Sequence, residues 1–151
     1  MTDYKPSDFI YYEMVLEGLE YQAMVLEDEL YLTLDNAEYL FNNADECFKS
    51  DYPADVLYEI QNEFRCDGEE CNSLLKEWSR HFEIDYYVKE FTGVTENGET
   101  ISKWIGWNYY YGGGKHAEPE AIDWIPDAEF VKVKSEEVVT VIKRIFEREV
   151  E

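Results

Sequence analysis

Residues 84–111 have the sequence IDYYVKEFTGVTENGETISKWIGWNYYY, and this stretch decides the fold. On both sides of Asn97-Gly98 the chain alternates between apolar and polar side chains, as half-buried strands do. Asn-Gly is the strongest short signal for a two-residue type I′ turn, because both central residues need positive φ. The stretch therefore predicts an antiparallel hairpin with strands at 84–95 and 99–111.

The second strand of this hairpin is rich in aromatic residues. The aromatic residues on this strand are Trp104, Trp107, Tyr109, Tyr110 and Tyr111, and Trp124 follows later in the chain. A central strand that is covered on both sides has such a composition. Exposed anchors of a protein interface are an alternative, because Tyr and Trp are enriched in interfaces. The sequence leaves both interpretations open, and Trp107 and Tyr110 are the candidate partner-binding rings.

The first third of the chain gives mixed signals. Residues 9–18 fit a helical stripe and also a strand, and we leave this element open. Residues 21–26 and 30–34 flank Glu27-Asp28-Glu29, and the leucines of 30–34 alternate with other residues, so we expect a second hairpin here.

Three helices are predicted between the two hairpins. Asp35 and Glu38 have the spacing of a cap for a helix over 36–49. Pro53 opens a second helix whose inner face holds Val56, Leu57, Ile60 and Phe64. A third helix begins near Asp67 and buries residues between Cys71 and Phe82.

The end of the chain predicts further strands and a helix. After Gly112-Gly113-Gly114 we expect a strand or two near 122–125 and 130–133. Ser135 caps a final helix that has glutamates at its start and Lys143, Arg144 and Arg148 near its end, as the helix dipole favours. The predicted fold is α+β: an antiparallel sheet packed with about three central helices and a C-terminal helix.

Size and composition favour one folded domain over residues 1–151. The chain is 45% hydrophobic and 17% aromatic, which is enough to build a core. No apolar run approaches the ~18 residues that span a bilayer, and the first residues lack the pattern of a signal peptide. Three cysteines are an odd number, so we expect reduced thiols and a cytoplasmic protein.

Charge is the strongest signal in the composition. Thirteen basic and 35 acidic residues give a net charge of −22. Residues 1–75 hold 19 acidic and 3 basic side chains, whereas residues 76–151 hold 16 and 10. Such a charge excludes DNA, RNA and anionic membranes as direct ligands, because these require Lys and Arg to neutralise phosphates. It favours a basic protein as the partner; the oligomeric state is left open.

Nine carboxylates are the candidate partner-binding acids. Asp55, Glu59 and Glu63 lie four residues apart on the second predicted helix, so they form one stripe with about 6 Å of rise between neighbours. Like charges at this spacing slightly destabilise a helix, so stability does not explain them. The others flank this region: Glu27, Asp28, Glu29, Asp45, Glu46 and Asp51. The alternative is an ordinary solvated helix face.

The amount of charge can be compared with duplex DNA. A folded chain of this length has a radius of gyration of roughly 15 Å and hence a diameter of about 38 Å. DNA carries one charge per ~1.7 Å, so a net charge of −22 matches about 37 Å of duplex. If the carboxylates gather on one side, the domain presents a charge density close to that of a short piece of DNA.

Catalytic and cofactor motifs are weak, and we expect neither a cofactor nor a bound metal. Gly112–Lys115 lacks the full phosphate-loop pattern. Cys66, Cys71 and two histidines lack the tight spacing of a zinc knuckle. A small enzyme or metal protein centred on His116, with the carboxylates of residues 118–123, is kept as an alternative.

In size, charge and carboxylate placement the chain resembles the small acidic proteins of phages and mobile elements that act against host defence, such as DNA-mimicking antirestriction and anti-CRISPR proteins. The resemblance covers the whole chain, is not a motif match and assigns no residue. It implies an inhibitor that binds the basic nucleic-acid surface of a nuclease or other nucleic-acid enzyme. The alternative is a bacterial immunity protein that neutralises one basic toxin.

Overall fold

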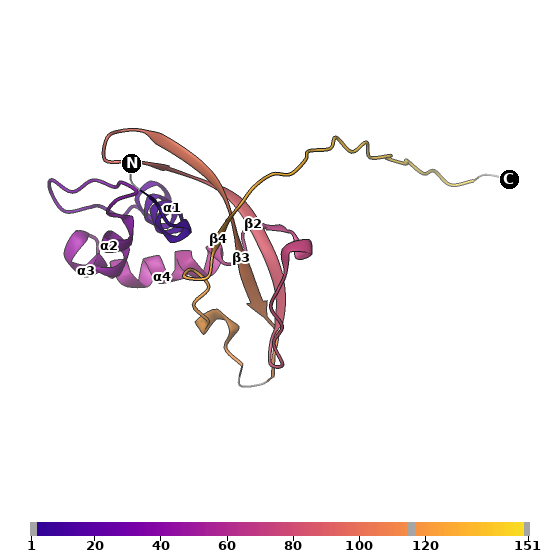
Figure 1. Ribbon diagram of the computed structural model, residues 1–151, viewed down its shortest axis with the longest axis horizontal. Coiled ribbons are helices and arrows are strands. Elements are labelled where there is room, and N and C mark those ends of the chain that lie inside the picture. Colours follow the sequence, from indigo (N-terminus) through magenta and orange to yellow (C-terminus); the bar gives the residue numbers. More distant parts are fainter. Residues whose placement is uncertain (1–2, 115–116, 150–151) are drawn as a thin grey trace.

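The protein is described by a computed structural model over residues 3–114 and 117–149. Its sheet has four antiparallel strands in the order β1-β2-β3-β4, and their bounds are Glu69–Glu70, Glu83–Val94, Thr100–Tyr111 and Glu129–Val131. Figure 1 shows the four α-helices gathered on one side of this sheet. The predicted α+β class with an antiparallel sheet is therefore confirmed.

The central hairpin is confirmed, although its turn differs from the prediction. β2 and β3 pair over twelve residues each, from Glu83 opposite Tyr111 to Val94 opposite Thr100. Of the two turn residues, Gly98 alone has positive φ, at 84°. The Gly98 N–H donates to the Thr95 carbonyl, and the Thr95 N–H donates to the Glu99 carbonyl. This is a longer turn with Gly98 in the left-handed position, the kind that adds a bulge to a hairpin.

The open element at residues 9–18 is helical. It belongs to α1, Pro6–Tyr21, which begins with a proline in its first turn. The Lys5 N–H donates to the Asp8 carboxylate at 2.8 Å, which satisfies a backbone donor at the start of the helix. α1 fitted both patterns because it packs against α2, α4 and β2 and is therefore apolar on several sides.

The second predicted hairpin, over residues 21–34, is wrong. Residues 22–36 form an irregular connection with one isolated bridge, between Leu26 and Phe48. Its backbone bonds run to the segment after α3: the Glu27 N–H donates to the Cys47 carbonyl, and the Lys49 N–H donates to the Val25 carbonyl, both at 2.8 Å. Residues 25–27 thus pair with residues 47–49 and not with residues 30–34. Alternation of apolar and polar residues within one segment does not reveal which other segment it pairs with.

The helix predicted over 36–49 is broken in two. α2 spans Ala37–Asn42 and α3 spans Ala44–Cys47. Between them the Asn43 side chain donates to the Tyr39 carbonyl at 3.0 Å, and such a bond competes with the helical backbone pattern. The helix that begins at Pro53 is confirmed as α4, Pro53–Phe64, with Leu57, Ile60 and Phe64 buried.

The helix predicted over about 67–82 is also wrong. This segment holds the short edge strand β1 and a 3₁₀ turn, η1, at Asn72–Leu74. The Cys71 N–H donates to the Tyr86 carbonyl, and the Tyr86 N–H donates to the Asn72 side chain, both at 2.7 Å. The edge of β2 satisfies its backbone groups with this segment, so tertiary pairing overrides the helical pattern.

The end of the chain departs most from the prediction. A 3₁₀ turn, η2, spans Pro119–Ala121, and residues 122–125 form no strand, although Trp124 and Ile125 are buried. β4 is the one strand found here. The helix predicted from Ser135 is absent from this structure, in which residues 132–149 are extended and exposed. Figure 1 shows this tail running away from the body.

The core lies between the helices and the sheet and is centred on Trp107. The Trp107 ring lies 6.0 Å from Phe91 and 5.4 Å from Trp124, measured between ring centroids. Its indole N–H donates to the Arg65 carbonyl at the end of α4, at 2.9 Å. Across residues 3–114 and 117–149, no helix combines the length and apolar character that a membrane crossing needs.

We predict that Gly98→Ala lowers the free energy of unfolding by about 1 kcal/mol, because an L side chain is strained in the left-handed region. A Cβ at Gly98 meets nothing within 4 Å, so the effect comes from the backbone alone. Gly98→Asn is the matched control and should lose less, since Asn tolerates this conformation. Urea denaturation measures both, and equal stability of Gly98→Ala and the wild type would contradict the assigned turn.

Candidate functional site

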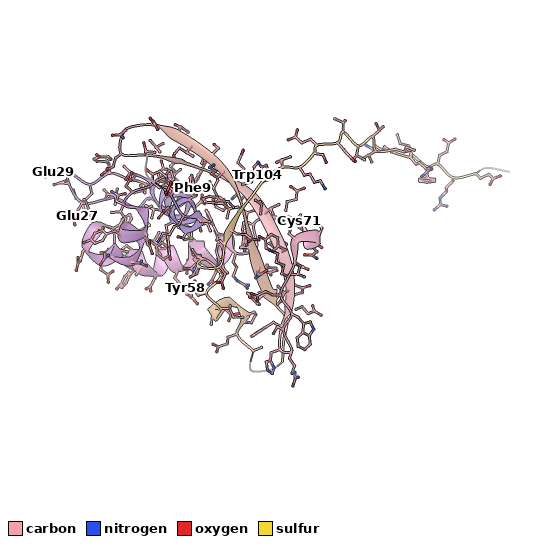
Figure 2. All side chains as sticks on the ribbon, viewed as in Figure 1. Phe9, Glu27, Glu29, Tyr58, Cys71 and Trp104 are labelled. Atoms are coloured by element: carbon pink, nitrogen blue, oxygen red, sulfur yellow. The ribbon has the colours of Figure 1, made fainter. Side chains whose placement is uncertain are left out.

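The nine predicted carboxylates are all exposed. They are Glu27, Asp28, Glu29, Asp45, Glu46, Asp51, Asp55, Glu59 and Glu63, and we call them the acidic surface. All come from the helical part of the chain: the 22–36 connection, α3, the segment that follows it and α4. In Figure 2, Glu27 and Glu29 project at the edge of the molecule furthest from the C-terminal tail.

Tertiary contacts bring the loop that carries Glu27, Asp28 and Glu29 close to the carboxylates of α3 and α4. The backbone bonds between residues 25–27 and 47–49 hold the loop of Glu27-Asp28-Glu29 against the end of α3. The Val25 N–H also donates to the Ser50 hydroxyl at 2.8 Å. The next residues, Asp51 and Tyr52, lead directly into α4. The loop acids and the start of the α4 stripe therefore lie in one connected region.

The α4 stripe is placed by the packing of the opposite helix face. Leu57, Ile60 and Phe64 point into the core, so Asp55, Glu59 and Glu63 point outward. Tyr52 and Tyr58 lie three residues from Asp55 on either side and are 77% and 52% exposed. Tyr58 is a neighbour of Asp55 on the helix surface, whereas Tyr52 precedes α4 and has a left-handed backbone conformation.

Cations are scarce in this region. Residues 20–63 contain twelve Asp and Glu and a single Lys. This residue is Lys49, and its ammonium group pairs with the Asp28 carboxylate. Within the described ranges, this is the only ion pair that a carboxylate of the acidic surface makes. Arg65, just beyond α4, is turned inward, where it donates to the Tyr110 carbonyl at 2.8 Å and lies 5.1 Å from the Tyr109 ring centre.

The two predicted aromatic anchors are not equivalent. Trp107 is 1% exposed, so it is a core residue and cannot serve as a surface anchor. Its strand is central, as the first interpretation of the aromatic stretch supposed. Tyr110 is partly buried, and its hydroxyl donates to Glu77 at 3.0 Å. Burial, followed by this hydrogen bond, raises the Tyr110 pKa above its usual value.

Sequence reasoning missed the exposed tyrosines of the acidic region. Each is more than half exposed: Tyr21, Tyr31, Tyr39, Tyr52 and Tyr58. For Tyr58 a signal existed, because helical spacing places it on the polar face of α4 with the carboxylates. Of the others, Tyr21 ends α1, Tyr31 lies in the irregular 22–36 connection, Tyr39 lies on α2 and Tyr52 directly precedes α4.

A groove of about 620 Å³ extends from the Glu63 end of the acidic surface. Its walls carry five carboxylates and one cation, Lys89, over apolar side chains that include Leu16 and Phe64. Three of the acids come from α1: Glu13, Glu17 and Glu20. Glu13 and Glu17 were missed because residues 9–18 were left open between helix and strand, and Glu20 follows them on the same helix. Lys89 pairs with Asp67 at 3.1 Å.

Glu13 is the most perturbed carboxylate of this groove. Its Oε2 accepts the Thr92 N–H at 3.2 Å on the edge of β2. Burial raises the Glu13 pKa from 4.5 to about 7, and the neighbouring Asp67 adds to the shift. The positive charge of Lys89 and the Thr92 hydrogen bond oppose it without cancelling it.

The alternative chemistries involve the cysteine thiols, the glycine loop and His116. Within residues 3–114 and 117–149, no three His, Cys, Asp or Glu side chains are placed to hold a metal. Burial raises the pKa of the Cys47 thiol, which disfavours the nucleophilic thiolate. Gly112 and Gly113 have positive φ and join β3 to η2. Lys115 and His116 lie outside the described residues.

Comparisons with protein-family models, with characterised proteins and with solved structures found no match.

We predict that Glu13→Gln stabilises the protein above pH 7 by roughly 1–2 kcal/mol. The folded-state pKa of about 7 exceeds the usual 4.5, so native Glu13 contributes stability below pH 4.5 that is lost as pH rises through 7. Gln keeps an acceptor for the Thr92 N–H and carries no charge. Denaturation at pH 5 and pH 8 compares the two proteins, with Glu17→Gln as the control. A Glu13 that titrates near 4.5 by NMR would contradict the assignment.

Proposed function

We propose that this protein is an inhibitor that binds the basic nucleic-acid surface of a nuclease or related enzyme and offers carboxylates in place of phosphates. The observation that carries the proposal is the acidic surface: nine exposed carboxylates from one connected helical region, where residues 20–63 supply twelve acids and one Lys. A nucleic-acid channel lined with Lys and Arg is complementary to such a surface.

The repulsion between the carboxylates of the acidic surface is better explained by partner binding than by a contribution to the stability of the fold. Like charges four residues apart on α4 destabilise that helix by a few tenths of a kcal/mol per pair. A basic partner that neutralises them removes this repulsion. Association between opposite charges is also fast and sensitive to salt, because salt screens exposed charges beyond about 8–10 Å.

The exposed tyrosines support an arginine-containing partner. An Arg guanidinium stacks on aromatic rings and forms paired hydrogen bonds with carboxylates. Tyr58 lies one turn from Asp55 on the outer side of α4, and Tyr52 directly precedes the helix, so a guanidinium can contact a ring and a carboxylate together. We further propose that the protein acts in the cytoplasm, where a nuclease meets nucleic acid.

Affinity capture tests the proposal. The tagged protein is incubated with a lysate that contains candidate nucleases and nucleic-acid enzymes and is then washed at low and high salt. Capture of a basic nucleic-acid enzyme that is released by salt and displaced by duplex DNA is the expected result. A partner that resists salt and ignores DNA would favour the neutralisation of a basic toxin instead.

We predict that Asp55→Asn combined with Glu59→Gln and Glu63→Gln weakens binding to the captured enzyme about tenfold, because each exposed pair contributes about 0.2–1 kcal/mol. The control removes three exposed carboxylates elsewhere, with Glu96→Gln, Glu99→Gln and Glu120→Gln. Both variants have the same net charge. Equal losses in a calorimetric titration would mean that total charge, and not the acidic surface, controls binding.

We predict that Tyr52→Ala with Tyr58→Ala lowers the same affinity several-fold at high salt, where the carboxylates contribute less and the ring contacts persist. Both rings are more than half exposed, so the fold should be retained. The control is Tyr31→Ala, a ring outside α4. Affinity that is unchanged in the double variant at every salt concentration rules out ring contacts on α4.

A further inference from the structure

The sheet has a second face that points away from the helices. Lys89, Ile105 and Phe130 lie in one row across β2, β3 and β4, and the ring centroids of Phe130 and Phe9 of α1 are 6.0 Å apart, so this row faces the helices. Side chains alternate along a strand, so the next row, Glu90, Trp104 and Val131, lies on the opposite face. We call this opposite face the outer face.

The outer face is apolar near its centre and remains partly exposed. Val88, Trp104 and Val131 are each partly buried and do not belong to the core between helices and sheet. Gly106 lies beside them, and the Tyr86 ring covers it so closely that a Cβ there would clash with the Tyr86 hydroxyl. α1 contacts the other face through Phe9, whereas the outer face is contacted toward its Tyr110 end by Glu77 and Phe82.

The tail that leaves this face is extended in the structure, but its sequence has the spacing of an amphipathic helix. At 100° per residue, its apolar side chains fall within an arc of about 160°. They are Val138, Val139, Val141, Ile142, Ile145 and Phe146, and each is more than 70% exposed in the extended tail. Ser135 and two glutamates precede this stripe, and basic residues follow it, in the order that favours a helix.

We propose that residues 136–148 form a helix that packs on the outer face of the sheet of the same chain. Val131 lies on the outer face, and only residues 132–135 separate it from the helix, which is an ordinary length for a strand-to-helix connection. Thirteen helical residues extend about 20 Å, which fits within the roughly 40 Å of a twelve-residue strand.

The difference in charge between the body and the tail favours docking of the tail helix on the outer face. Residues 1–131 hold 30 acidic and 8 basic side chains, whereas residues 132–149 hold 4 and 5. Glu90 and Glu129 are exposed on the outer face, and Lys143 and Arg144 flank the apolar stripe of the helix. A stripe as wide as 160° also exceeds the narrow seam of a two-helix coiled coil and suits a broad surface such as a sheet.

The extended tail is the undocked state of this equilibrium. A helix of thirteen residues is marginal in water without a surface to pack against, so it unfolds when it leaves the sheet. Docking therefore orders the tail and covers Trp104 at the same time. This inference does not depend on the proposed function, because the outer face and the acidic surface share no residue.

Hydrogen exchange on the full chain, read by mass spectrometry, tests the proposal. We expect the amides of residues 138–146 to exchange more than about tenfold slower than an unstructured peptide, at a monomeric mass and independently of protein concentration. Exchange at the unstructured rate overturns the proposal. Protection that grows with concentration, together with a dimeric mass, also overturns it, because the helix then packs on a second copy.

Three variants locate the contact. Ile142→Glu, in the apolar stripe, should abolish the protection of residues 138–146, whereas Thr140→Glu, on the opposite side of the helix, should retain it. Trp104→Gln should also abolish it while the amides of the β2–β3 hairpin stay protected, which shows that the body remains folded. Protection that survives Trp104→Gln places the helix elsewhere and overturns the proposal.

Discussion

The hydrogen bond from the Trp107 indole to the Arg65 carbonyl joins the sheet to the end of α4, the helix that carries the stripe of Asp55, Glu59 and Glu63. Trp107 is also the ring around which Tyr87, Phe91 and Trp124 pack. Because α4 is held at this end and buries Leu57 and Ile60 along its length, its carboxylate stripe has to face solvent. The Arg65 guanidinium points inward and donates to the Tyr110 carbonyl, so it does not neutralise the carboxylates of the stripe.

The elements that could be predicted are those whose signals are local. The β2–β3 hairpin combines long alternation with Asn97-Gly98, and α4 combines Pro53 with an unbroken apolar stripe, so neither needs a distant partner to be recognised. Even there the turn type was missed, because Asn-Gly fits more than one turn and the choice depends on how the strands twist. The exposed carboxylates of α4 followed from the same helical spacing.

The elements that could not be predicted are those settled by tertiary pairing. Residues 22–36 give their backbone bonds to the end of α3, and residues 69–72 give theirs to the edge of β2, while both sequences favour a different local structure. Trp107 could be read as core or as interface until the position of its strand was known. The groove beside Glu13 could not be foreseen because it forms where α1, α4 and β2 meet.

The two faces of the sheet give the molecule two separable surfaces. Trp107 and Trp104 lie on the same strand three residues apart, so they point to opposite faces: one toward the helices that carry the carboxylates, the other toward the side from which the tail departs. A change in the charge of α4 therefore leaves the contacts of Trp104 in place, and a change at Trp104 leaves the acidic surface in place. The net charge of −22 couples the two sides only through long-range repulsion, which salt screens within about 8–10 Å. Binding of a basic partner to the helical side can thus proceed whether or not the tail is docked on the other.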